Sequence, residues 1–88
     1  MSEWIYPDVI KKLRFSCMAF LDGKLSVAEV QSEIDNAGNS IVAVEEKWLR
    51  QELLDAESDI ELLVFTIDNE KLTEAVTPIV QNIIKAIS

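Results

Sequence analysis

Carboxylates are the main chemically capable groups in this 88-residue sequence, which has sixteen Asp and Glu residues, one cysteine and no histidine. The lack of histidine removes the side chain that most often serves as a general base near neutral pH or as a metal ligand. Cys17 lies near Phe15, Met18 and Phe20, a setting typical of a buried and unreactive thiol. Ser–His and Cys–His catalytic pairs cannot form, and we expect a protein that is not an enzyme.

The spacing of three of these acids imitates part of a calcium-binding loop. Asp55, Glu57 and Asp59 alternate like its first three ligands, but Ile60 stands where the loop needs glycine and Thr66 where it needs a bidentate glutamate. Exposed carboxylates on a helix also keep a pKa of about 4, so they make poor acid or base catalysts near neutral pH. The sequence therefore predicts no metal site and no cofactor.

A different role for the acids follows from helical spacing. At about 100° per residue, five residues of the predicted third helix fall within an arc of about 80°, so that four carboxylates surround one indole: Glu45, Trp48, Glu52, Asp55 and Asp59. An aromatic residue flanked by charge is typical of a protein-binding hot spot. The alternative is that Trp48 is an ordinary core residue and the acids form a solvated face. A second group on the other flank is expected to be solvated: Glu46, Glu57 and Glu61, with Arg50.

The net charge of −8 indicates the chemistry of the partner. Residues 27–66 alone contain ten acidic and two basic residues, so the charge is concentrated on the predicted second and third helices. Such a field repels phosphate backbones and anionic lipids, which makes nucleic acid and membranes poor partners. It favours a basic protein, including one whose site is built for RNA or DNA.

Two helices are predicted in the first half of the chain. The first begins near Pro7, which suits a first helical turn, and ends at about Leu21. The second begins at Ser26, because Ser26 and Glu29 form a capping box and Leu25 and Val30 occupy the positions of a hydrophobic staple. We expect Gly38 to end this helix in a left-handed conformation.

A long third helix of about 20 to 26 residues is predicted after Ser40, which is expected to be its N-cap. The alternative is that this helix is broken near Ser58. Its apolar seam keeps helical spacing: Val42, Leu49, Leu53, Ala56, Ile60, Leu63 and Ile67. The β-branched and aromatic run from Val64 to Ile67 leaves a short strand as an alternative for that stretch.

Asp68 or Asn69 is predicted to cap the last helix. Its apolar stripe consists of Leu72, Val76, Ile79 or Val80, Ile83 and Ile87. Pro78 interrupts this helix, either as a kink or as the start of a fresh segment capped by Thr77.

Four amphipathic helices joined by short loops predict an all-α protein, a four-helix antiparallel bundle forming one domain over residues 1–88. Trp4 and Tyr6 are expected to close one end of the bundle. The opening Met-Ser-Glu-Trp has no basic and apolar leader pattern, and nowhere do eighteen apolar residues run together. With a single cysteine, the chain is expected to be cytoplasmic.

Three parts of the sequence resemble a known family. The run Phe20-Leu21-Asp22-Gly23-Lys24-Leu25-Ser26-Val27-Ala28-Glu29-Val30, the long acidic helix, and Ile67-Asp68-Asn69-Glu70-Lys71-Leu72 with Val76 and Ile79 resemble the colicin D type of bacterial immunity protein. This group includes immunity proteins of contact-dependent growth inhibition systems. The resemblance implies a small acidic helical protein that blocks the basic active site of a nuclease toxin domain, in particular a tRNase. The alternative is a helical antitoxin or adaptor that forms a homodimer by burying the seam of the third helix against its copy.

Overall fold

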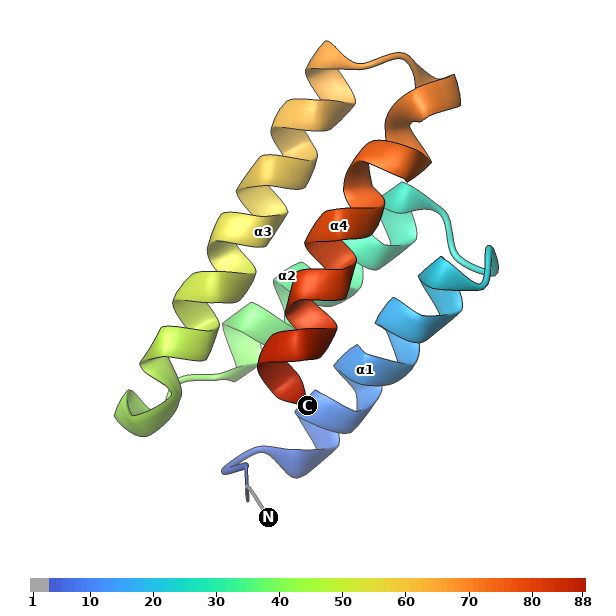
Figure 1. Cartoon of the computed structure of the whole chain (residues 1–88). Coiled ribbons are helices and arrows are strands. Elements are labelled where there is room, and N and C mark those ends of the chain that lie inside the picture. Colours follow the sequence, from blue (N-terminus) through green and yellow to red (C-terminus); the bar gives the residue numbers. More distant parts are fainter. Residues whose placement is uncertain (1–3) are drawn as a thin grey trace.

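The computed structural model describes residues 4–88, which form four α-helices and one short 3₁₀ turn (Figure 1). Their bounds are α1 (Pro7–Leu21), α2 (Val27–Ser40), η1 (Val44–Glu46), α3 (Lys47–Thr66) and α4 (Asn69–Ile87). No strand occurs among the described residues. Successive helices run in opposite directions, as the short loops require.

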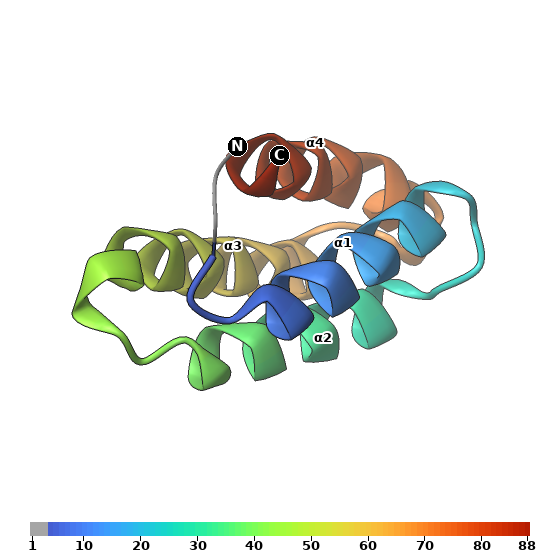
Figure 2. The same ribbon diagram turned by 90° about the horizontal axis from the view of Figure 1, so that it is seen from below.

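The helices close into a ring, because α2 packs against α1 and α3 while α4 packs against α3 and α1 (Figure 2). The bundle measures 38 × 22 × 17 Å. Each helix turns an apolar stripe inward, and its buried side chains form one core that includes Leu13, Cys17, Ile34, Leu53, Ile60, Val76 and Val80. The predicted all-α four-helix bundle is confirmed.

The boundaries of α1 and the start of α2 follow the local sequence signals. Pro7 is the first residue of α1 and Leu21 the last. At the start of α2, the Ser26 hydroxyl accepts from the Glu29 N–H at 3.1 Å, and Glu29 accepts from the Ser26 N–H at 3.0 Å. The predicted capping box is therefore confirmed, and it gives acceptors to the N–H groups of Ser26 and Glu29.

The expected end of α2 is wrong. Gly38 lies inside the helix with no left-handed conformation, and α2 continues to Ser40, whose hydroxyl donates to the Asn36 carbonyl oxygen at 2.9 Å. Ser40 therefore does not cap the third helix. The physical reason is tertiary: Ala37 and Ile41 are buried on either side of Gly38, and extending α2 carries this apolar stripe into the core.

The third helix starts later than predicted. The 3₁₀ turn η1 precedes α3, and Val42 is an exposed loop residue outside the core, while Ile41 is fully buried. The 20 residues of α3 run through Ser58 without a break, within the predicted length. The strand alternative near Val64 is wrong, because the helix continues to Thr66 and Ile67 follows it as the C-cap.

The last helix passes through Pro78 as one element. The fresh-segment alternative is wrong, because the Thr77 hydroxyl donates to the Thr73 carbonyl oxygen and caps no new helix. Asp68 occupies the N-cap position, and its side chain makes no capping hydrogen bond. The predicted stripe is buried, with Val80 rather than Ile79 as its inward residue.

Candidate protein-interaction face

The orientation of α3 decides which of its side chains reach the surface. Its buried residues Leu49, Leu53, Ala56 and Ile60 point into the core. Helix α2 covers one flank, because the Glu57 carboxylate accepts from Gln31 Nε2 at 3.0 Å and Leu54 lies beside Gly38. At about 100° per residue, Trp48, Glu52, Asp55 and Asp59 lie on the opposite flank. All four are exposed.

We call these four residues, Trp48, Glu52, Asp55 and Asp59, the acidic face. Trp48 is 51% exposed, so the alternative that it is an ordinary core residue is wrong. Among residues 4–88 none of the three carboxylates forms an ion pair, and one makes a side-chain hydrogen bond, in which Gln51 Nε2 donates to Asp55 at 2.9 Å. The negative charge of the face is therefore not neutralised within the described chain.

The fifth predicted residue, Glu45, is exposed but lies in η1 rather than in α3. The α-helical spacing that grouped it with the other four does not apply across a 3₁₀ turn, which has about three residues per turn. Glu45 is a neighbour of the acidic face by sequence, and the helix register does not place it there.

The second acidic group is not the solvated flank that the spacing predicts. Glu46 is only 5% exposed, and its Oε2 accepts from the Ile5 N–H at 2.7 Å. Glu57 is half-buried and hydrogen-bonded to Gln31 of α2. Glu61 alone is an exposed acid without such a contact. The prediction fails because helical spacing alone does not show which neighbouring segment covers a flank.

The start of the described chain packs beside the acidic face. The rings of Trp4 and Trp48 lie 5.9 Å apart between centroids and are tilted by 38°. Trp4 and Tyr6 are partly buried against the core, at the end of the bundle where they were expected. The contact between the two indoles was not expected, since nothing local in the sequence connects residues 4 and 48.

Exposed apolar side chains lie near the acidic face in the C-terminal part of α3. Leu62 is exposed beside the acidic face, and Phe65 is 79% exposed near the C-terminus of the helix. Neither residue was predicted to belong to a binding surface. The sequence held a signal for both, because neither belongs to the apolar seam. Apolar residues of a helix that lie outside its buried stripe are expected on the surface.

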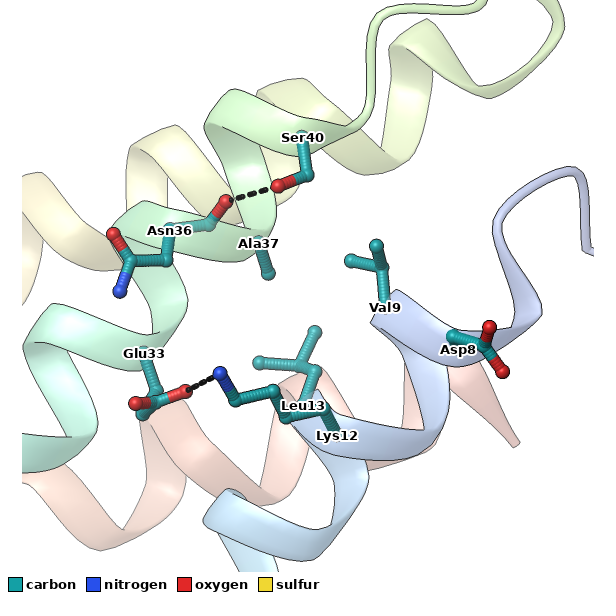
Figure 3. Close-up of a pocket in the computed structure, with 8 residues that line it drawn as sticks. All are labelled: Asp8, Val9, Lys12, Leu13, Glu33, Asn36, Ala37 and Ser40. Atoms are coloured by element: carbon teal, nitrogen blue, oxygen red, sulfur yellow. Dashed lines mark hydrogen bonds and ion pairs between the residues drawn. The ribbon is translucent and has the colours of Figure 1, made fainter.

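The one cysteine of the chain and a groove between two helices lie away from this face. Burial raises the pKa of the Cys17 thiol to about 12, so it stays protonated and unreactive. A groove of about 270 Å³ lies between α1 and α2 (Figure 3). Val9, Leu13 and Ala37 give it apolar walls, and Lys12 Nζ pairs with a Glu33 oxygen at 3.8 Å across it. The Ser40 hydroxyl, which also lines the groove, donates to the Asn36 carbonyl oxygen.

Residues 4–88 also contain no group of three or more potential ligands placed to hold a metal ion. None of the helices formed by these residues has the length and apolar character needed to cross a bilayer. Comparison of the chain with known proteins identifies no relative: no protein-family model, curated protein or solved structure matches it.

Proposed function

We propose that the protein is an immunity-type inhibitor whose acidic face binds the basic active site of a nuclease toxin domain. The observation that supports this most directly is the half-exposed indole of Trp48 among three exposed carboxylates that have no cationic partner in residues 4–88. Surfaces that hold other proteins commonly centre on an aromatic anchor. Unpaired carboxylates complement a cationic cleft. The sequence resemblance to immunity proteins indicates the same kind of partner.

The dimensions of the face suit a cleft that binds a polyanion. Glu52 and Asp59 are seven residues apart, which is about 10 Å along the helix axis at about 1.5 Å per residue. A rigid helix holds these charges at fixed separations, so they can occupy positions that RNA phosphates would take in a nuclease, of which a tRNase is the type that the resemblance implies. The partner would supply Lys and Arg side chains, and the enzyme activity would belong to the toxin.

The same charge argues against other partners. A chain of net charge −8 is repelled by nucleic acid and by anionic membranes at moderate ionic strength. A cytoplasmic location suits a protein with one free and buried cysteine, and it is where a nuclease toxin reaches its RNA.

The homodimer alternative receives less support from the structure. The seam formed by Leu49, Leu53, Ala56 and Ile60 is already buried within one chain, so it is not available to a second copy. A homodimer would need another surface, such as the exposed Leu62 and Phe65. It would also bring two chains of charge −8 together, which opposes association.

The test begins with the gene immediately upstream, which should encode a long secreted toxin. Its C-terminal nuclease domain is purified and mixed with this protein, and complex formation and RNA cleavage are measured together. We expect a one-to-one complex and loss of cleavage, with RNA competing for the same site. Cleavage that continues at a large excess of this protein, or no toxin gene upstream, would count against the proposal. Sedimentation of the protein alone distinguishes a monomer from a homodimer.

A further inference from the structure

Glu46 is a buried carboxylate that holds two distant parts of the chain together. It immediately precedes α3, where a side-chain oxygen commonly accepts a hydrogen bond from its own helix. Instead Oε2 accepts from the N–H of Ile5, 41 residues away, at 2.7 Å. The other oxygen, Oε1, is buried and finds no donor among residues 4–88. Burying a carboxylate is unfavourable, and among residues 4–88 the hydrogen bond from the Ile5 N–H is the interaction that opposes this cost.

The contact at Ile5 fixes the residue before it. Trp4 is partly buried against the core, and its ring packs 5.9 Å from that of Trp48. Trp48 therefore has Trp4 on one side while about half of its surface stays open to solvent. An exposed indole without such support would sample several rotamers.

We infer that Glu46 and Trp4 are positioning residues, which hold the indole of Trp48 in one orientation at the end of the acidic face for contact with the basic partner. The role toward the partner rests on the proposed function, whereas the packing of Trp4 on Trp48 is a property of the free protein. Fixing a side chain before binding removes part of the entropy that binding would otherwise lose. Glu46 thus acts through Trp4, and Trp4 through Trp48, although neither belongs to the acidic face.

The free protein offers a direct test, because Trp4 and Trp48 are its two tryptophans. Two indoles in fixed contact give an exciton couplet in far-ultraviolet circular dichroism. We expect this couplet in the wild type and its loss in Trp4→Phe and Trp48→Phe. Glu46→Ala removes the acceptor for the Ile5 N–H and should also abolish the couplet, whereas Glu46→Gln keeps an acceptor oxygen and should restore it. Glu61→Ala is the matched control, since it removes one charge from an exposed site on the other flank of α3.

Binding is then measured with the purified toxin domain by titration calorimetry. Glu46→Ala and Trp4→Phe should each weaken the affinity roughly 2- to 10-fold, the range expected when one side chain must be immobilised on binding. Glu46→Gln and Glu61→Ala should stay close to the wild type. Trp4→Phe leaves Glu46 in place. Its affinity therefore shows whether the paired indoles contribute to binding, even if Glu46→Ala folds poorly.

The outcomes separate this inference from the proposed function. A couplet that survives Glu46→Ala overturns the role of Glu46, and unchanged affinity in Trp4→Phe overturns the role of the paired indoles in binding. If the wild-type protein does not bind the toxin domain, the proposed function fails and the role toward that partner fails with it. The couplet then still decides whether Glu46 positions Trp4.

Discussion

Reversing the charge of the acidic face should weaken partner binding strongly and leave the fold intact. The variant carries Glu52→Lys, Asp55→Lys and Asp59→Lys. Each replacement adds two units of charge, so three of them change the net charge from −8 to −2. All three residues are exposed on α3, where a surface substitution usually changes stability by no more than about 0.5 kcal/mol, and lysine is a good helix former.

The expected loss of affinity follows from Coulomb's law. Two unit charges about 4 Å apart in water interact by about 1 kcal/mol, so reversing one contact changes its energy by about 2 kcal/mol. Three contacts give about 6 kcal/mol, and screening at physiological salt lowers this to about half. At about 1.4 kcal/mol per factor of ten, the affinity for the toxin domain should fall between about 10²- and 10⁴-fold.

The control variant must change the net charge by the same six units, through exposed acids outside the acidic face. Glu46 and Glu57 are unsuitable, because one is buried against Ile5 and the other is hydrogen-bonded to Gln31. Asp22, Asp35 and Glu61 are exposed and make no side-chain hydrogen bond among the described residues, so their triple reversal to lysine is the matched variant. Calorimetry with the toxin domain should show a large loss for the first triple and a small one for the second. Equal losses would mean that only the overall field matters, and no loss in either would refute the assignment of the face.

Three further predictions concern electrostatic attraction, helix capping and the thiol. The association rate with the toxin domain should fall steeply as salt rises while dissociation changes less, as stopped-flow mixing would show, because steering acts on the encounter; a rate that does not depend on salt would contradict it. Ser26→Ala should lower the free energy of unfolding by about 0.5 to 2 kcal/mol in urea titrations, since the Glu29 N–H loses its acceptor, and an unchanged midpoint would contradict the role of the capping box. Because burial raises the pKa of the Cys17 thiol from 9.0 to about 12, its contribution to stability is complete below pH 9 and is lost as the pH rises toward 12, where the unfolded chain alone is ionised. A thiol reagent at pH 8 should therefore modify Cys17 only after unfolding, and rapid reaction with the folded protein would show that the thiol is accessible.

The features that the sequence predicted correctly depend on residues close together in the chain. The capping box at Ser26 joins residues three apart, and the stripe of α4 repeats every three or four positions. Such patterns determine a local conformation and the side of a helix that becomes buried. The fold class follows from them, because four amphipathic helices with short loops have few ways to bury their apolar stripes.

The features that the sequence did not predict depend on contacts between distant residues. Glu46 looked like one of several surface acids, and its burial comes from Ile5, which the fold brings to it. The same applies to Trp48, whose partial cover is Trp4. For the acidic face, Trp48, Glu52, Asp55 and Asp59 are all exposed residues of α3, which is consistent with the flank that helical spacing predicts. That spacing wrongly extended the helix back to Glu45, because nothing in the local sequence marks the 3₁₀ turn.

Gly38 is a residue whose local sequence signal, a left-handed helix end, was overruled by packing, and its backbone conformation can be tested by mutation. Gly38 is helical, and a Cβ there would lie 3.7 Å from Leu53 Cβ and 3.8 Å from Leu54 Cδ2, which are ordinary packing distances. Gly38→Ala should therefore stabilise the protein by about 1 kcal/mol, because alanine is the better helix former by about that amount. Gly23 is the matched opposite: its φ is 79°, so Gly23→Ala should destabilise the protein by about 1 to 2 kcal/mol even though nothing lies within 4 Å of the added methyl group. Urea denaturation of both variants measures the two signs. A left-handed Gly38 at the end of α2 would instead make both variants less stable, and that result would refute the continuous helix through Ser40.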